Sequence, residues 1–201
     1  GPAIFEEDFE ASVSGASTFS NAISGNYGLK KLGVGALSLT GANTYKGNTS
    51  VSAGTLILGN TTATGSGTLV NDATVNVATG VISVKVQGLS GTTASANFSL
   101  SNLDATPLAV AMTVGENGAS TSYAGVISGS GSLTKVGSGS LSLLNTTNTF
   151  TGETAINGGM LEATSQGSLG DTNSVIKLNG GTLKLGNQFS SLTRHLYLDT
   201  G

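Results

Sequence analysis

Apolar residues recur at every second position over short stretches of this chain, and glycine or asparagine interrupts each stretch. From Leu37 to Leu58 the sequence reads LSLTGANTYKGNTSVSAGTLIL, in which aliphatic residues alternate with serine and threonine. A period of two places the aliphatic side chains on one face of a β-strand. Glycine can adopt the positive φ angles that tight corners require. The pattern therefore predicts short strands joined by glycine corners, and no stretch shows the sustained 3.6-residue spacing of a helix.

The chain contains an internal duplication. Residues 23–58 and 127–163 align without a gap as far as Leu39 and Leu143, and they align again after a one-residue insertion. The shared positions include glycines, an asparagine and an aromatic residue, and we expect them to form the framework of each copy. These structural repeat positions are Gly33, Gly35, Asn43, Tyr45, Gly47 and Gly54 in the first copy, and Gly137, Gly139, Asn148, Phe150, Gly152 and Gly159 in the second.

A shorter pattern of strand, glycine corner and strand occurs four times. It reads VSAGTLIL, VATGVISV, INGGMLEA and LNGGTLKL, with its corner glycine at Gly54, Gly80, Gly159 and Gly181. Spacings of 26 residues within the first pair and 22 within the second are typical of stacked repeats. We therefore predict an all-β fold, a right-handed parallel β-helix of roughly nine turns about 4.8 Å apart. The competing fold is an antiparallel β-sandwich, which also uses short alternating strands.

Four segments are expected along the chain. Residues 1–18 form an acidic N-terminal cap, 19–87 a β-helix with the first long repeat, and 119–201 a β-helix with the second, truncated at its end. Residues 88–118 fit neither repeat, and Pro107 disfavours both a helix and a central strand. This middle segment is predicted to leave the rod as a hairpin or long loop, or to form an irregular turn with a long corner.

Composition excludes several classes of protein. Charged residues make up 9% of the chain and hydrophobic residues 37%, which argues against disorder. Cysteine is absent, so disulfides and thiolate metal sites are impossible. The net charge of −3 and the scattered basic residues argue against a nucleic-acid partner. Because no apolar run approaches the roughly 20 residues of a membrane helix, we expect no membrane insertion by this segment.

Residues that could carry catalysis are isolated. A β-helical polysaccharide enzyme needs clustered carboxylates, whereas no paired motif occurs among Asp72, Asp104, Glu116, Glu153, Glu162, Asp171 and Asp199. His195 is the only histidine and therefore the only imidazole that could activate a serine; we interpret it as a surface residue of a strand. The acidic opening FEEDFE could gather a cation, but a capping strand explains it better. We expect no catalytic residue, no metal site and no cofactor.

Two repeat positions are ambiguous between core and surface. Tyr45 and Phe150 could present a binding face, although an aromatic residue at a fixed place in each repeat more often stacks inside a solenoid. Asn43 and Asn148 precede these rings, and their amides are expected to satisfy backbone groups of the turn.

The duplicated segment resembles the autotransporter-associated β-strand repeat of passenger domains in type V secretion. It has the opening Leu-x-Lys-x-Gly-x-Gly-x-Leu-x-Leu and the centre Asn-x-aromatic-x-Gly-x-Thr. The first copy fills these places with Leu29, Lys31, Gly33, Gly35, Leu37, Leu39, Asn43, Tyr45, Gly47 and Thr49. The second fills them with Leu133, Lys135, Gly137, Gly139, Leu141, Leu143, Asn148, Phe150, Gly152 and Thr154. The resemblance implies a right-handed β-helical stalk on the bacterial cell surface, outer membrane-anchored as part of a longer protein.

Three functions are carried forward. The preferred one is a non-enzymatic stalk that supports adhesion or display and aids outer-membrane export. The second is a subunit of a self-assembling extracellular fibre, and the third is a polysaccharide-active enzyme. The expected partners are a host or cell-surface ligand, or a second copy joined end to end.

Overall fold

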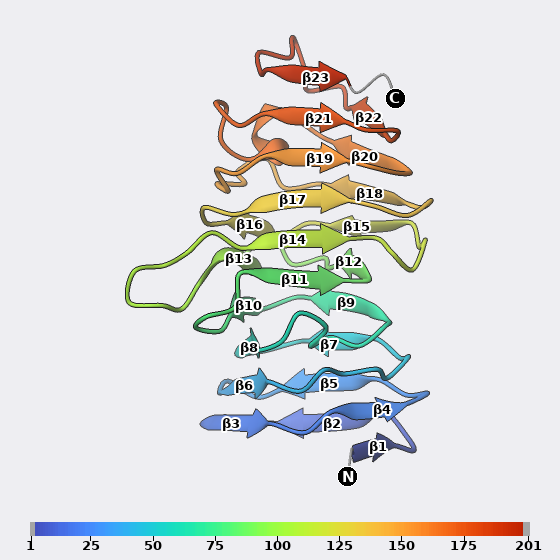
Figure 1. Cartoon of the computed structure of the whole chain (residues 1–201), viewed down its shortest axis with the longest axis vertical. Coiled ribbons are helices and arrows are strands. Elements are labelled where there is room, and N and C mark those ends of the chain that lie inside the picture. Colours follow the sequence, from blue (N-terminus) through green and yellow to red (C-terminus); the bar gives the residue numbers. More distant parts are fainter. Residues whose placement is uncertain (1–2, 199–201) are drawn as a thin grey trace.

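The chain is a stack of short parallel strands. The computed structural model describes residues 3–198, in which twenty-three strands and one short 3₁₀ helix, η1 (Gln166–Leu169), wind through about 10 turns. Every pairing between the named strands is parallel, as the arrows of successive layers in Figure 1 show. The predicted parallel β-helix is confirmed, and the alternative of an antiparallel sandwich is wrong.

Each turn passes over three faces, which we number in chain order. Face 1 contains β1 (Ala3–Phe5), β4 (Ile23–Gly25), β11 (Ser83–Val86), β14 (Ala111–Val114), β17 (Ser132–Lys135), β19 (Thr154–Ile156), β21 (Ile176–Leu178) and β23 (Leu196–Leu198). Face 2 contains β2 (Phe9–Ser12), β5 (Leu29–Leu32), β7 (Thr49–Val51), β9 (Thr68–Asn71), β12 (Gly88–Ser90), β15 (Thr121–Tyr123), β18 (Ser140–Leu143), β20 (Met160–Ala163) and β22 (Thr182–Leu185). Face 3 contains β3 (Ala16–Phe19), β6 (Ala36–Leu39), β8 (Thr55–Leu58), β10 (Thr74–Val77), β13 (Asn97–Asn102) and β16 (Val126–Ser128).

The register of the strands shows a shorter turn than the glycine spacing suggests. Thr55 pairs with Thr74, and Ala36 pairs with Ala16, so these turns contain 19 or 20 residues. The 26-residue spacing from Gly54 to Gly80 is therefore not one turn. Gly80 lies one corner further on, because it follows β10 and precedes β11. The 22-residue spacing in the second pair is a true turn, since Met160 pairs with Thr182.

The two long repeats occupy different faces of the rod. In the first copy β5 lies on face 2 and β6 on face 3, whereas their equivalents β17 and β18 lie on faces 1 and 2. The second copy is thus displaced by one face relative to the first. Because each copy keeps its local structure on a different set of faces, that structure is determined by the repeat and its immediate neighbours.

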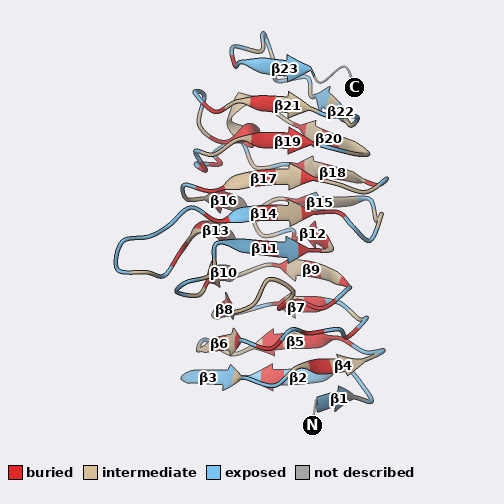
Figure 2. Cartoon of the chain, viewed as in Figure 1, coloured by how far each residue is buried: buried red, intermediate tan, exposed pale blue. Residues whose placement is uncertain are grey.

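The core is a continuous column of inward side chains. Burial alternates along most strands, as in β6, where Leu37 and Leu39 are fully buried and the intervening Ser38 faces outward. Figure 2 shows buried segments in successive layers of the stack. Burying one leucine completely contributes about 2 kcal/mol relative to leaving it in water. The repeated alternation therefore stabilises every layer through contacts with the layers on either side.

The middle segment combines regular strands with an excursion. β12, β13 and β14 remain in the stack, and the chain between β13 and β14 projects from it (Figure 1). An antiparallel bridge joins Ser101 to Ala109 at the base of this projection. The buried Asn102 fixes the base, because its Oδ1 accepts a hydrogen bond from Leu108 N (2.8 Å) and its Nδ2 donates one to Asp104 Oδ2 (2.7 Å).

The acidic opening belongs to the first turn of the stack. β2 pairs with β5 in register, and Lys30 on β5 makes ion pairs with Glu10 (3.4 Å) and Asp8 (3.8 Å). Residues 3–18, which the sequence suggested as part of a cap, therefore contribute strands to all three faces.

Candidate functional site

Each long repeat encloses a lysine ammonium group in backbone carbonyl oxygens. Lys31 is the last but one residue of β5 and is fully buried. Its Nζ donates hydrogen bonds to the carbonyl oxygens of Leu32 (2.9 Å) and Gly33 (2.7 Å), at the corner that follows β5. A third bond goes to Ala53 O (3.0 Å), at the same corner one turn later. We call this arrangement the first lysine cage.

The second repeat reproduces this arrangement on another face. Lys135 ends β17 and is buried, and its Nζ donates to Val136 O (2.6 Å), Gly137 O (3.3 Å) and Gly158 O (3.4 Å). The carbonyl of Gly158 again comes from the following turn. We call this the second lysine cage; two of its bonds are longer than those of the first.

Among the described residues, no carboxylate pairs with the lysine of either cage. Among the ion pairs of residues 3–198, the lysines are Lys30, Lys85, Lys177 and Lys184, all partly exposed. Desolvation by burial lowers the pKa of both Lys31 and Lys135 below its usual range. Carbonyl dipoles are thus the groups that hold these two positive charges inside the rod.

Left-handed glycines shape both cages. Gly33 and Gly137 have φ angles of 75° and 70°, and Gly54 and Gly159, one turn further, have 68° and 60°. Successive corners also approach closely: a Cβ on Gly54 would lie 2.4 Å from Gly35 O. Only glycine tolerates this combination of backbone angle and close contact.

The remaining repeat glycines mark further close contacts between turns. In each case a Cβ would lie 2.1 to 2.3 Å from an atom of an adjacent turn, usually a backbone atom. These positions are Gly35, Gly47, Gly139, Gly152 and Gly181, the last of which faces the side chain of Ile156. The corners thus stack too closely to admit a side chain at these places.

The repeat asparagines bridge three successive turns. Asn43 Oδ1 accepts from Ile23 N (2.8 Å) in the preceding turn, and its Nδ2 donates to Ala63 O (2.6 Å) in the following one. Asn148 makes the same pair of bonds, at 2.8 Å and 2.7 Å. Both amides are buried and take the place of a peptide group in the ladder, where the chain forms no strand.

The aromatic residues of the two repeats are fully buried, so neither contributes to an exposed binding face. The Tyr45 hydroxyl makes a short hydrogen bond to Thr49 Oγ1, which also donates to Thr64 O (3.1 Å). Phe150 occupies the place of Tyr45 but has no hydroxyl. The equivalent threonine oxygen, Thr154 Oγ1, is buried without a hydrogen-bond partner.

The candidate catalytic carboxylates are dispersed and serve local structure. Ion pairs to lysine hold Glu116, Glu153 and Glu162, whereas Asp72, Asp104 and Asp171 accept hydrogen bonds from backbone N–H groups. Hydrogen bonds from Lys85 and Gln87 lower the pKa of Glu116. Asp199 lies outside the described residues. Within residues 3–198, no three histidine or acidic side chains converge on a position that could hold a metal ion.

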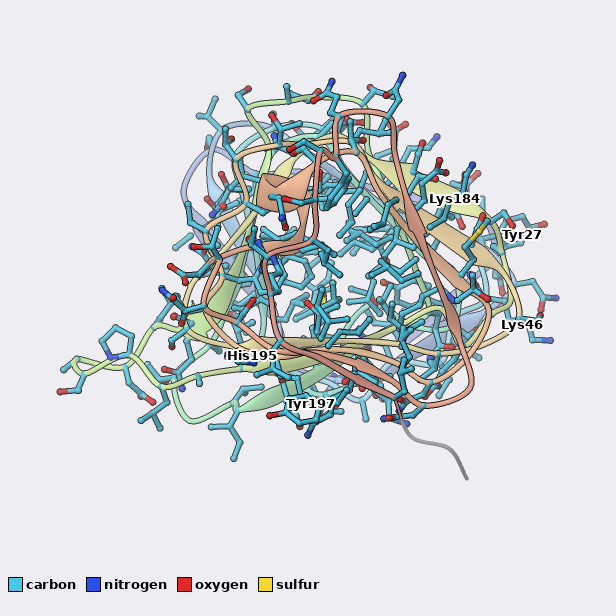
Figure 3. All side chains as sticks on the ribbon, turned by 90° about the horizontal axis from the view of Figure 1, so that it is seen from above. Tyr27, Lys46, Lys184, His195 and Tyr197 are labelled. Carbon is cyan, nitrogen blue, oxygen red and sulfur yellow. The ribbon has the colours of Figure 1, made fainter. Side chains whose placement is uncertain are left out.

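His195 and the exposed aromatic and basic residues form no common site. Figure 3, viewed along the rod axis, shows Tyr27, Lys46 and Lys184 on one side and His195 and Tyr197 on another. All five are exposed and lie outside the filled interior. The His195 carbonyl accepts a hydrogen bond from Ile176 N (3.0 Å), and the residue thereby joins the last two layers.

Sequence reasoning missed the burial of the two lysines and of Arg194. The alternation of side chains along the strand could have predicted the burial of Lys31. Lys31 follows Leu29 by two positions, so its side chain points inward on the same face. Arg194 Nη1 donates to Leu169 O (2.9 Å), and its Nη2 donates to Gln166 O (2.6 Å) and Gly170 O (2.7 Å). Because Arg194 lies beyond the second copy, no repeat position predicts its burial.

The two ends of the stack differ in their surfaces. An apolar cavity of about 330 Å³ lies at the N-terminal end, lined by Ala3, Phe9, Thr18, Phe19, Ser20, Asn21 and Ile23. At the C-terminal end, Leu196, Tyr197 and Leu198 of β23 are exposed. None of the helical segments in the described part of the chain is long and apolar enough to cross a membrane.

Comparisons with known proteins identify the two long repeats and one similar protein. The Passenger-associated-transport-repeat family matches residues 29–58 and 133–163, the two long repeats. The chain is 32% identical over 190 residues to the adhesin BmaC autotransporter of Brucella suis biovar 1 (strain 1330). This alignment covers 90% of the chain but only 6% of the length of that adhesin. No solved structure matches the chain.

Proposed function

We propose that this chain, a β-helical passenger segment of the autotransporter kind, is a non-enzymatic stalk that spaces and displays an adhesive region at the bacterial cell surface. The observation that carries the proposal is the continuous internal bonding of the rod. Every layer is joined to its neighbours by parallel ladders, and buried lysine and asparagine side chains connect the corners. A solenoid with such nearest-neighbour contacts resists bending and local opening.

The absence of a catalytic function is part of the proposal. It is supported by the separation of the described carboxylates and by their structural hydrogen bonds and ion pairs. A screen of polysaccharide hydrolysis and elimination with the folded segment tests it. We expect no turnover. If turnover is found and is lost when Glu153 or Glu162 is substituted, the result favours the carbohydrate-enzyme alternative.

A contribution to export follows from the same bonding. Each turn that stacks on folded neighbours gains hydrogen bonds and buried apolar area, and this free energy can oppose return of the chain. In the full-length protein, residues 23–58 should be replaced by a scrambled sequence of equal composition. We expect slower surface exposure, measured by protease accessibility on cells; an unchanged rate would contradict the export role.

The projection between β13 and β14 is proposed as the part of this segment that contacts a partner. Leu103 and Leu108 are about half exposed on it, and its base is fixed by Asn102. Exposed apolar residues on a fixed support are typical of interaction sites. Cell-adhesion assays with Leu103→Ser and Leu108→Ser together should show reduced attachment with unchanged stability, and unchanged attachment would contradict this role.

A second candidate function is end-to-end association into fibres. The apolar cavity at the first turn and the exposed leucines of β23 are the apolar surfaces that would meet in such an association. Electron microscopy of the purified segment tests this: filaments shortened by Ile4→Lys would support it, and uniform single rods at high concentration would contradict it.

A further inference from the structure

Each lysine cage buries a charged side chain in the core, at a cost in free energy of folding. In the stack, Lys31 lies between Ala11 and Val51, and Lys135 lies between Val114 and Ile156. Burying an ammonium group costs several kcal/mol unless good partners compensate for the lost water. A methionine would have a similar length without that cost. Stability alone therefore does not account for a lysine at this place in both repeats.

The apolar pattern leaves the register between turns ambiguous. In β6 and β8, Leu37 lies opposite Leu56, and Leu39 lies opposite Leu58. If one strand slips by two residues so that Leu39 meets Leu56, these leucines still point inward, and Leu37 then lies opposite Gly54. A slip of one residue is excluded because it would turn the leucines to the outside, whereas a slip of two keeps them on the inward face.

The cages distinguish these registers. The corner of Lys31 leads directly into β6, and the corner of Ala53 leads into β8. Lys31 Nζ reaches Ala53 O only when the two corners lie directly above each other. A two-residue slip moves that carbonyl by about 7 Å along the strand and leaves the ammonium with two of its three acceptors. The wrong register is therefore penalised by an incompletely solvated charge.

We propose that Lys31 and Lys135 are register determinants, whose ammonium groups select the correct corner of the following turn as acceptor. This inference deepens the proposed stalk function and rests on it, because a rod needs one register throughout. The occurrence of both cages on different faces supports it, since the same selection operates wherever the repeat is placed.

Cysteine pairs can report the register, because the natural chain has no cysteine. Ser38 and Ile57 are direct partners on the outer surface of face 3, so Ser38→Cys with Ile57→Cys reports the correct register. Ser38→Cys with Thr55→Cys reports a two-residue slip. Each reporter is introduced into the wild-type chain, a Lys31→Met variant and a Lys46→Met control, since Lys46 is exposed. The proteins are refolded from denaturant in a glutathione redox buffer.

In the wild type and the Lys46→Met control, only the correct-register pair should form its disulfide. In Lys31→Met the slipped register no longer leaves a buried ammonium short of an acceptor, so the slipped pair should form in a measurable fraction of the molecules, above its level in the wild type. The thermal midpoint should fall by no more than a few degrees, because methionine removes the cost of burying a charge.

Two results would overturn the inference. One is a Lys31→Met chain that closes only the correct-register pair at the wild-type rate. The other is a variant that loses its β-sheet circular dichroism, since the lysine would then act through stability. Failure of the correct-register pair in the wild type would instead contradict the rod and its proposed function. An equivalent pair, Ser142→Cys with Glu162→Cys, tests Lys135→Met independently.

Discussion

The unpaired hydroxyl of Thr154 provides a quantitative test of the repeat core. The first repeat shows the missing interaction, because the Tyr45 hydroxyl donates a hydrogen bond to the equivalent Thr49 Oγ1. Phe150→Tyr should place a hydroxyl beside Thr154 Oγ1, which is buried without a partner. A buried unsatisfied polar group costs about 1–3 kcal/mol, and a new hydrogen bond contributes about 1 kcal/mol net. We expect Phe150→Tyr to raise the free energy of unfolding by about 1 kcal/mol.

Urea unfolding followed by circular dichroism measures this change. For a chain of this size, about 1 kcal/mol corresponds to a rise of roughly 2–4 °C in thermal midpoint. The reciprocal change, Tyr45→Phe, should lower stability by about 1 kcal/mol, and Thr49 would keep its bond to Thr64 O. A Phe150→Tyr variant less stable than the wild type would show that the two repeats do not share a core geometry, and would refute the reasoning.

Three further predictions concern a corner glycine, a bridging asparagine and a caged lysine. Gly54 and Gly80 have similar φ angles, 68° and 74°, but of these two only Gly54 is crowded. Gly80→Ala should lower the free energy of unfolding by about 1–2 kcal/mol because of its backbone angle alone. Gly54→Ala should lower it distinctly more, and urea unfolding measures both changes. Asn148→Ala should cost about 2–4 kcal/mol, because it leaves a buried N–H and a buried carbonyl without partners; equal stability to the wild type would contradict the bridging role. The lowered pKa of Lys135 means that the unfolded chain binds more protons than the folded one between that pKa and the ordinary value of 10.5. Wild-type stability should therefore rise relative to Lys135→Met as the pH is raised toward 10.5, and a constant difference would contradict burial of the charge.

The sequence allowed the architecture to be predicted because its apolar period is local. Every second residue of β6 and β8 points inward, and this parity is set by the strand itself. The corner glycines could be recognised for the same reason, since their backbone angle depends on a few adjacent bonds. The length of a turn could not be predicted from Gly54 and Gly80, because similar local sequences occur at successive corners of one turn as well as at the same corner of successive turns.

The displacement of the second repeat by one face was also beyond sequence reasoning. It depends on how many corners residues 88–118 contribute, and strand pairing decides that number. The lysine cages could be predicted from the sequence only in part. The inward parity of Lys31 could be read from Leu29, but its acceptor Ala53 O lies 22 residues away and becomes a neighbour only when the turns stack.

Distances between spin labels along face 3 test the stacked, parallel rod most directly. Thr18, Ser38, Ile57 and Asn76 follow one another on the outer surface in consecutive turns, and Ser128 lies two turns beyond Asn76. With one label at Thr18, the expected backbone separations are near 10, 14 and 24 Å for partners at Ile57, Asn76 and Ser128, a rise of about 4.8 Å per turn. Dipolar broadening of the continuous-wave spectrum measures the two shorter ones, and double electron–electron resonance measures the longest. Separations that do not increase steadily with the number of turns would contradict the β-helix and every proposal built on it.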